Sequence, residues 1–269
     1  MNEQIGFMDL NGLRLRTNPA RDACFTVVNS DAEMHEYDDA SEDARRELVH
    51  RHMSNEVTSL DIAAQILNDF PEAPWALRME VARQCWDESR HVAILYRRLL
   101  EMGGRKGEFP ISAFEWNVTS ALDDIASRLA TQNRTFEAGA MDVVGGLGRA
   151  FRALGDNRSA DVLDAILADE IQHVRFANQW IKRLARSDRR VLLRVAMAVR
   201  FLAEANARLV WQDGQVNAVG KVFRDPSETI PAVNVEDRRL AEFSDEEIAE
   251  ILRQAGFRTL IPEPEPDGS

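Results

Sequence analysis

The sequence predicts an all-α protein whose core is a bundle of four long helices, with an additional C-terminal helix and irregular termini. Long segments place apolar residues at spacings of three and four, proline and glycine separate these segments, and few stretches alternate as strands do. With 269 residues, 45% of them hydrophobic, the chain is long enough for one sizeable core. We expect an irregular segment over 1–40, a helical bundle over 41–211, and an extension over 212–269 that holds a short helix and a disordered tail.

The first two helices are expected over residues 41–69 and 74–102. A turn with two prolines, residues 70–74, ends the first helix, and Gly103-Gly104 ends the second.

Further helices are expected later in the chain. Gly145, Gly146 and Gly148 interrupt the pattern after the third long helix, and Gly155-Asp156-Asn157 precedes the fourth. The expected spans are 118–142, 149–154, 158–186, 188–211 and 244–255.

Composition argues against several classes of protein. No run of about 18 apolar residues exists, so we expect no membrane-spanning segment, and we expect no secretory signal. The formal net charge of −12 disfavours general nucleic-acid binding, because an acidic chain repels phosphate. Cys24 and Cys85 lack the spacing of a metal site or a disulfide framework, so a reducing cytoplasm is the expected location.

Two copies of Asp-Glu-x-x-His are the segments most able to carry chemistry. Asp87-Glu88-Ser89-Arg90-His91 lies in the second expected helix, and Asp169-Glu170-Ile171-Gln172-His173 lies in the fourth long one. Because residues three apart share a face of a helix, each Glu and His can reach one metal ion from one side.

A single glutamate precedes each copy at nearly the same distance. Glu56 lies 32 residues before Glu88, and Glu137 lies 33 residues before Glu170. Each half of the chain thus supplies Glu and then Glu-x-x-His, which is the ligand set of the di-iron carboxylate bundles. Four carboxylates balance two divalent cations, and imidazole suits iron, manganese or zinc. The candidate catalytic and metal-binding residues are Glu56, Glu88, His91, Glu137, Glu170 and His173.

The aspartates of the two motifs, Asp87 and Asp169, are candidates for contacts with the metal-binding histidines from outside the metal site. A metal-bound histidine usually donates its other ring N–H to a carboxylate. We expect Asp87 to pair with His173 and Asp169 with His91 across the bundle, and pairing within each helix stays open.

These residues also have plainer interpretations. A lone Glu-x-x-His is most often a surface pair, but two copies among five histidines, both flanked by apolar residues, favour a metal site. His52, one turn before Glu56, is either an extra ligand or substrate contact, or a polar histidine that binds nothing. Cys85 and Met141 either line a substrate pocket or fill the core. The plainer interpretation is favoured for His52 and Cys85.

The chain also resembles a known family. The segments Arg51-His52-Met53-Ser54-Asn55-Glu56 and Phe136-Glu137-Ala138-Gly139-Ala140-Met141-Asp142, together with both Asp-Glu-x-x-His motifs, resemble a bacterial ferritin-like family labelled a domain of unknown function. The resemblance covers about residues 41–186. It implies membership of the ferritin-like di-iron carboxylate superfamily, whose enzymes use a reduced di-iron pair and dioxygen to oxidise an organic substrate.

This resemblance implies an oxygen-activating non-haem di-iron oxidoreductase of the hydroxylase or N-oxygenase type. Its cofactor would be two iron ions, with a manganese–iron pair as the alternative. Its partners would be a small organic substrate, dioxygen and an external electron donor. The alternative function is iron storage or detoxification by ferroxidase action, which predicts a hollow cage, whereas a monomer or homodimer favours an enzyme. A tRNA-modifying hydroxylase is disfavoured by the acidic charge.

Overall fold

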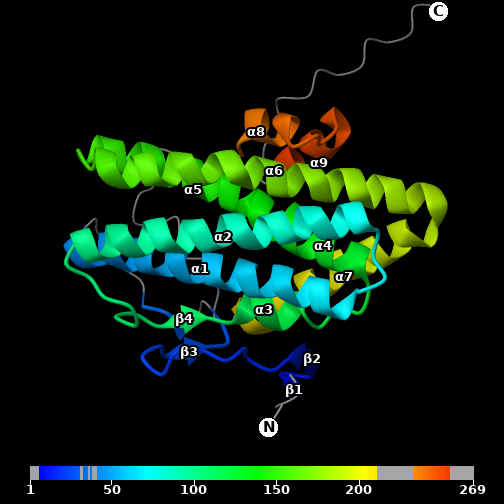
Figure 1. The fold of residues 1–269 in the computed structure, drawn as a ribbon, viewed down its shortest axis with the longest axis horizontal. Helices are drawn as coiled ribbons and strands as arrows, with labels where there is room; N and C mark the ends of the chain where they lie inside the picture. The colour runs from blue at the N-terminus through cyan, green and yellow to red at the C-terminus, as the bar shows by residue number, and fades with distance from the viewer. Residues whose placement is uncertain (1–5, 31–32, 36, 38–40, 211–232, 255–269) are drawn as a thin grey trace, which may run out of the picture.

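The computed structural model describes residues 6–30, 33–35, 37, 41–210 and 233–254, and it is mostly helical (Figure 1). The all-α prediction is therefore confirmed. Within these ranges no helix is both long and apolar enough to cross a membrane. Residues 212–232 and the tail of the expected extension over 212–269 lie outside the described residues.

The helices follow one another along the chain, and two of the segments, η2 and η3, are π-helices with a wider turn. Their bounds are α1 (Glu42–Asp69), α2 (Trp75–Glu101), α3 (Phe114–Thr119), α4 (Ile125–Thr131), η2 (Gln132–Glu137), α5 (Ala138–Ala153), α6 (Asn157–Ser187), α7 (Arg190–Ala205), η3 (Asn206–Val210), α8 (Val235–Leu240) and α9 (Asp245–Gln254).

In the described part of the chain, four short strands lie in the N-terminal region and before α3. Strands β1 (Phe7–Leu10) and β2 (Leu13–Arg16) form an antiparallel hairpin, and β3 (Val27–Val28) pairs in parallel with β4 (Ile111–Ser112). The indole N–H of Trp116 in α3 donates to the carbonyl of Thr17 over 2.8 Å. This bond ties the hairpin segment to the helical core.

Local signals set the bounds of the first two helices. The hydroxyl of Ser41 accepts the backbone N–H of Ala44 over 3.2 Å and so caps the start of α1. Helix α2 ends at Glu101, and Gly103 follows in the left-handed conformation with φ of 78°. Because residues 70–74 are a tight turn, α1 and α2 run side by side in opposite directions (Figure 1).

The third long helix differs from the prediction. In place of one helix over 118–142 and a separate one over 149–154, the chain forms α3, α4, η2 and α5. Helix α5 runs without a break through Gly145, Gly146 and Gly148. Leu147 and Phe151 of α5 are buried in the core, and this packing outweighs the low helix propensity of glycine.

Two apolar clusters lie at different heights along α1, α2, the continuous α4–η2–α5 segment and α6. One contains Ile62 and Ile66 of α1, Leu77 and Val81 of α2, Leu129 of α4, and Phe176 and Trp180 of α6. The other contains Leu48 and Met53 of α1, Leu95 and Leu99 of α2, Leu147 and Phe151 of α5, and Leu163 and Ile166 of α6. Between them each segment carries charged residues, so a polar layer is enclosed between two apolar ones.

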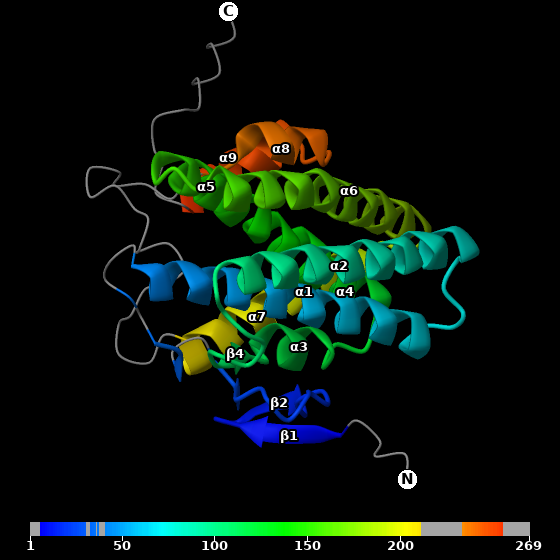
Figure 2. The same ribbon diagram turned by 60° about the vertical axis from the view of Figure 1, so that its left-hand side comes forward.

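The C-terminal helices pack on the outer side of α6 (Figure 2). The guanidinium of Arg175 donates to the carbonyl of Leu240 over 2.7 Å, and the amide of Asn178 donates to the carbonyl of Ala241 over 2.8 Å. Helices α8 and α9 thus add bulk outside the four segments that enclose the polar layer.

We expect Gly107→Ala to destabilise the fold more than Gly103→Ala. Both glycines have positive φ, 74° and 78°, which costs an alanine about 1–2 kcal/mol. At Gly107 the new Cβ would also lie 2.3 Å from the carbonyl oxygen of Cys24, whereas nothing lies within 4 Å of that position at Gly103. Urea unfolding should show a larger loss of free energy for Gly107→Ala, and equal losses would contradict the close approach.

Candidate metal centre

Six charged side chains from α1, α2, η2 and α6 make up the polar layer. Each of these residues is at most 5% exposed. The structure brings together at this level all six candidates: Glu56, Glu88, His91, Glu137, Glu170 and His173.

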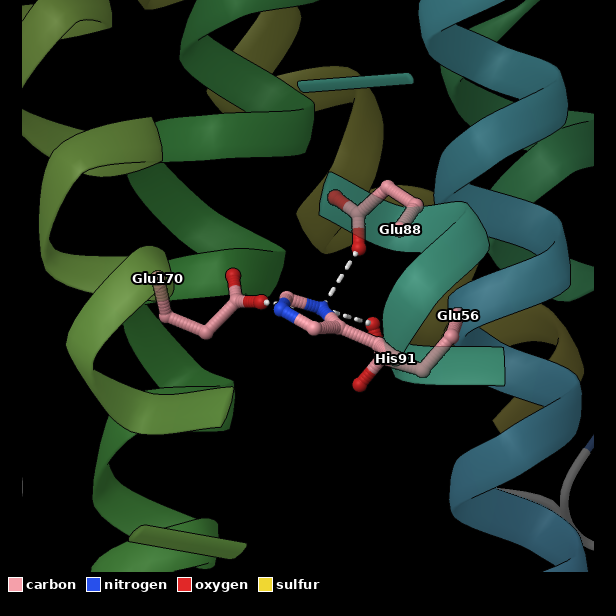
Figure 3. Close-up of side chains that lie close together, drawn as sticks. All are labelled: Glu56, Glu88, His91 and Glu170. Atoms are coloured by element: carbon pink, nitrogen blue, oxygen red, sulfur yellow. Dashed lines mark hydrogen bonds and ion pairs between the residues drawn. The ribbon is translucent and has the colours of Figure 1, made fainter. Parts of the chain in front are cut away.

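Three carboxylates surround the imidazole of His91 (Figure 3). Its Nδ1 lies 3.1 Å from Glu56 Oε2, 3.1 Å from Glu88 Oε2 and 3.4 Å from Glu170 Oε1. One ligand atom from each of these four residues can be chosen so that all lie within 4.8 Å of one another. This buried group could therefore hold a metal ion.

The imidazole of His173 faces the same two central carboxylates from the other side. Its Nδ1 lies 3.4 Å from Glu88 Oε1 and 3.3 Å from Glu170 Oε2. Glu88 and Glu170 thus each direct one oxygen to His91 and the other to His173. Each of these two carboxylates thus lies between two possible metal positions, one beside each imidazole.

Glu137 is held differently from the other three glutamates. Its Oε1 accepts hydrogen bonds from the amide of Gln84 over 3.2 Å and from the amide of Gln132 over 2.9 Å. Gln84 also donates to Glu88 Oε1 over 3.0 Å, and Asn133 donates to Gln84 over 2.8 Å. A buried set of amides therefore fixes the carboxylate on the η2 side of the layer.

The sequence did not reveal these amides. Gln84 lies one turn before Glu88, which is a weak signal by itself. Gln132 lies five residues before Glu137, and an α-helix would turn these two side chains apart. The π-helix η2, which has a wider turn, brings them together.

The aspartates of the two motifs contact the far side of each imidazole. Asp169 Oδ2 lies 3.2 Å from His91 Nε2, and Asp87 Oδ2 lies 3.4 Å from His173 Nε2. Each contact crosses between α2 and α6. The guanidinium of Arg90, which the sequence analysis did not single out, bonds to both aspartates, to Asp87 over 2.6 Å and to Asp169 over 2.9 Å.

The three weaker candidates lie at the edge of the layer or beyond it. His52 Nε2 is 3.1 Å from Glu56 Oε1, and burial lowers the pKa of this histidine to about 4, so it is neutral at pH 7. Cys85 is half-buried, and burial raises the pKa of its thiol to about 11. Met141 is fully buried against Val174 and Phe243, where it fills the space between α5, α6 and the C-terminal helices.

Burial dominates the electrostatics of the site. It raises the pKa of Glu56 and of Glu170 well above the usual value, and neighbouring carboxylates raise both further. Burial alone would lower the pKa of His91, but its contacts with Glu56 and Glu88 outweigh burial and raise that pKa to about 11. Without a cation, the folded protein must keep protons in this layer.

The donor set fits a metal ion on these observations. Four buried carboxylates face two imidazoles, and Glu170 Oε1 is buried without a hydrogen-bond partner. Two imidazoles cannot balance four buried carboxylates, and divalent cations would supply the missing positive charge.

A family model described as "Protein of unknown function (DUF455)" matches residues 4–249 of the chain. No curated protein and no solved structure gave a match.

We expect the metal-free protein to lose stability as the pH rises from 7 to 9. In this window an unfolded histidine, with an ordinary pKa of 6.5, is neutral, whereas folded His91, with a pKa of about 11, keeps its proton. The folded state then binds more protons than the unfolded state, so the free energy of unfolding falls by about 1.4 kcal/mol per pH unit for each proton retained. Urea unfolding of chelator-treated protein at three pH values measures this slope.

His91→Gln removes the proton retained on this imidazole and should reduce the slope to the part that the raised pKa values of Glu56 and Glu170 leave. An unchanged slope in this variant, or a stability that rises from pH 7 to 9 in the unmodified chain, would contradict the assignment.

Proposed function

We propose that this chain, which belongs to the DUF455 family of proteins of unknown function, is an oxygen-activating non-haem di-iron oxidoreductase. Its substrate would be a small organic molecule, and the reaction would be a hydroxylation or an N-oxygenation. On this proposal α1, α2, the η2–α5 segment and α6 form a four-helix bundle of the ferritin-like kind, which carries the site at its centre.

The shared placement of Glu88 and Glu170 between two imidazoles carries the proposal. One ion would be held by Glu56 and His91 and the other by Glu137 and His173, with the two central carboxylates common to both. Six side chains leave coordination positions free for small molecules. Bound as a ferrous pair, the two ions would supply electrons for the activation of dioxygen.

The residues around the site suit this chemistry. The two apolar clusters on either side of the layer exclude water, which strengthens every electrostatic interaction inside it. Gln84 and Gln132 orient Glu137, and Asp87 and Asp169 orient the imidazoles by accepting their outer N–H groups.

We expect the full chain, purified without oxygen and loaded with Fe(II), to hold two iron ions. Glu88→Ala and His173→Ala should each hold fewer than two, because each removes a side chain that belongs to the paired site. Glu80→Ala, which changes an exposed glutamate on the same helix, should still hold two. Iron is counted by mass spectrometry after gel filtration. Two ions in Glu88→Ala, or none in the unmodified chain, would contradict the proposal, and loading with manganese and iron together tests the mixed pair.

An enzyme and an iron-storage protein differ in assembly and in their reaction with oxygen. We expect a monomer or dimer whose ferrous form, mixed with dioxygen, is oxidised in a single turnover that an organic substrate accelerates. Light scattering measures the mass, and stopped-flow absorbance measures the oxidation. A large hollow shell that keeps taking up iron would instead support ferroxidase and storage activity. Helices α8 and α9, which cover the outer side of α6, argue against close packing of a shell through that face.

A further inference from the structure

His52 places an imidazole nitrogen without a hydrogen bond beside the metal centre. It lies one turn before Glu56 in α1, and its side chain is 11% exposed. Its Nε2 is buried 3.1 Å from Glu56 Oε1, yet it forms no hydrogen bond with the described part of the chain. Because a buried nitrogen without a hydrogen bond is costly, this position favours a partner that the protein itself does not supply.

Glu56 divides its two oxygens between two imidazoles. Oε2 lies 3.1 Å from His91 Nδ1, whereas Oε1 points away from His91 (Figure 3) and lies 3.1 Å from His52 Nε2. The carboxylate of Glu56 therefore lies between the two imidazoles. An ion bound by this carboxylate could reach a nitrogen on either side of it.

The distances within this group are those expected between neighbouring ligands of one metal ion. Two donor atoms that lie at right angles, each about 2.1 Å from an ion, are about 3 Å apart. Both Glu56–imidazole distances are 3.1 Å, and His91 Nδ1 is also 3.1 Å from Glu88 Oε2. The nitrogen of His52 thus continues the same set of spacings by one more donor atom.

We propose that His52 is a seventh metal ligand, which binds through Nε2 to the same ion as Glu56 and His91. The inference rests on the proposed di-iron function, because it assigns this residue to one ion of that pair. The ion beside His91 then has two imidazole ligands, whereas the ion beside His173 has one.

The other half of the site has an amide where the α1 side has His52. The residue four positions before Glu137 is Asn133, whose side-chain amide donates to Gln84 over 2.8 Å. A seventh ligand on the α1 side alone would therefore make the two ions inequivalent. The ion beside His91 would have more nitrogen ligands and fewer free positions, so small molecules would bind more readily to the ion beside His173.

A hydrogen bond to Glu56 is the competing role for His52. A proton on Nε2 would have to be directed at Glu56 Oε1, and the contact, although short, lacks the geometry of a hydrogen bond. A lone pair on Nε2 instead suits a metal cation, because a neutral imidazole is a common metal ligand.

The test counts metal-bound imidazoles in the full chain loaded with Co(II). By NMR, each bound imidazole gives one strongly shifted resonance from its outer N–H group, and this resonance disappears in heavy water. We expect three such resonances in the unmodified chain, from His52, His91 and His173, and two in His52→Gln. With excess cobalt this variant should still hold two ions, but it should bind one of them at least about tenfold more weakly.

His50→Gln is the matched control. His50 is also a buried histidine of α1, two residues before His52, and its Nε2 accepts the backbone N–H of Gly107 over 3.1 Å. A glutamine oxygen can accept the same bond. This variant should therefore keep the fold, all three shifted resonances and the cobalt affinity of the unmodified chain.

Two shifted resonances in the unmodified chain, or three in His52→Gln, would overturn the seventh ligand. Equal cobalt affinities of His52→Gln and the unmodified chain would also overturn it. A chain that holds no pair of metal ions would overturn both this inference and the proposed function. Failure of the function alone would appear as a ferrous pair that does not react with dioxygen, while the three resonances of the cobalt form remain.

Discussion

The burial of four glutamates in one layer of the core is the constraint on which the rest of the structure depends. Carboxylates removed from water are costly unless they are protonated, hydrogen-bonded or bound to a cation. Here the two imidazoles and the amides of Gln84 and Gln132 provide part of the compensation, and Glu170 Oε1 remains without a hydrogen bond. A layer of this kind persists only if the surrounding fold is stable enough to hold it.

The fold meets this requirement by placing an apolar cluster on each side of the layer. In α1 the order along the chain is Met53, then Glu56, then Ile62, and in α2 it is Val81, then Glu88, then Leu95. Because the two helices run in opposite directions, the same order of heights is read forward in one and backward in the other. Each segment thus anchors its charged residue from both ends, which fixes the height of that residue relative to its neighbours.

The sequence predicted the helical class, and the spacing within the two Asp-Glu-x-x-His motifs, with the repeated distance to Glu56 and Glu137, indicated the six side chains that lie in the core. The pairing of Asp87 with His173 and of Asp169 with His91 was expected because a metal-bound histidine usually donates its other ring N–H to a carboxylate. Prediction failed where the backbone leaves the α-helix or where packing outweighs propensity. The π-helix η2 brings Gln132 to Glu137 at a spacing that an α-helical pattern hides, and α5 continues through glycines because Leu147 and Phe151 are buried. The contacts of Arg90 could not be predicted, because an exposed arginine in a helix carries no signal of the two aspartates that it joins.

The near-repeat of 81 to 82 residues between the halves of the site makes the ligands symmetric but not their surroundings. Glu56 lies beside a neutral, largely buried His52, whereas Glu137 accepts hydrogen bonds from two amides. An amide donor stabilises the charged form of a carboxylate and restricts its rotation, and a neutral imidazole without a hydrogen bond to that carboxylate does neither. Glu56 instead contacts the imidazole of His91 over 3.1 Å, so the two carboxylates are held by different kinds of partner. Glu56 and Glu137, which the sequence presents as equivalent, therefore have chemically distinct surroundings. The difference arises from the π-helix η2, which brings an amide to Glu137, and from His52, which lies one turn before Glu56.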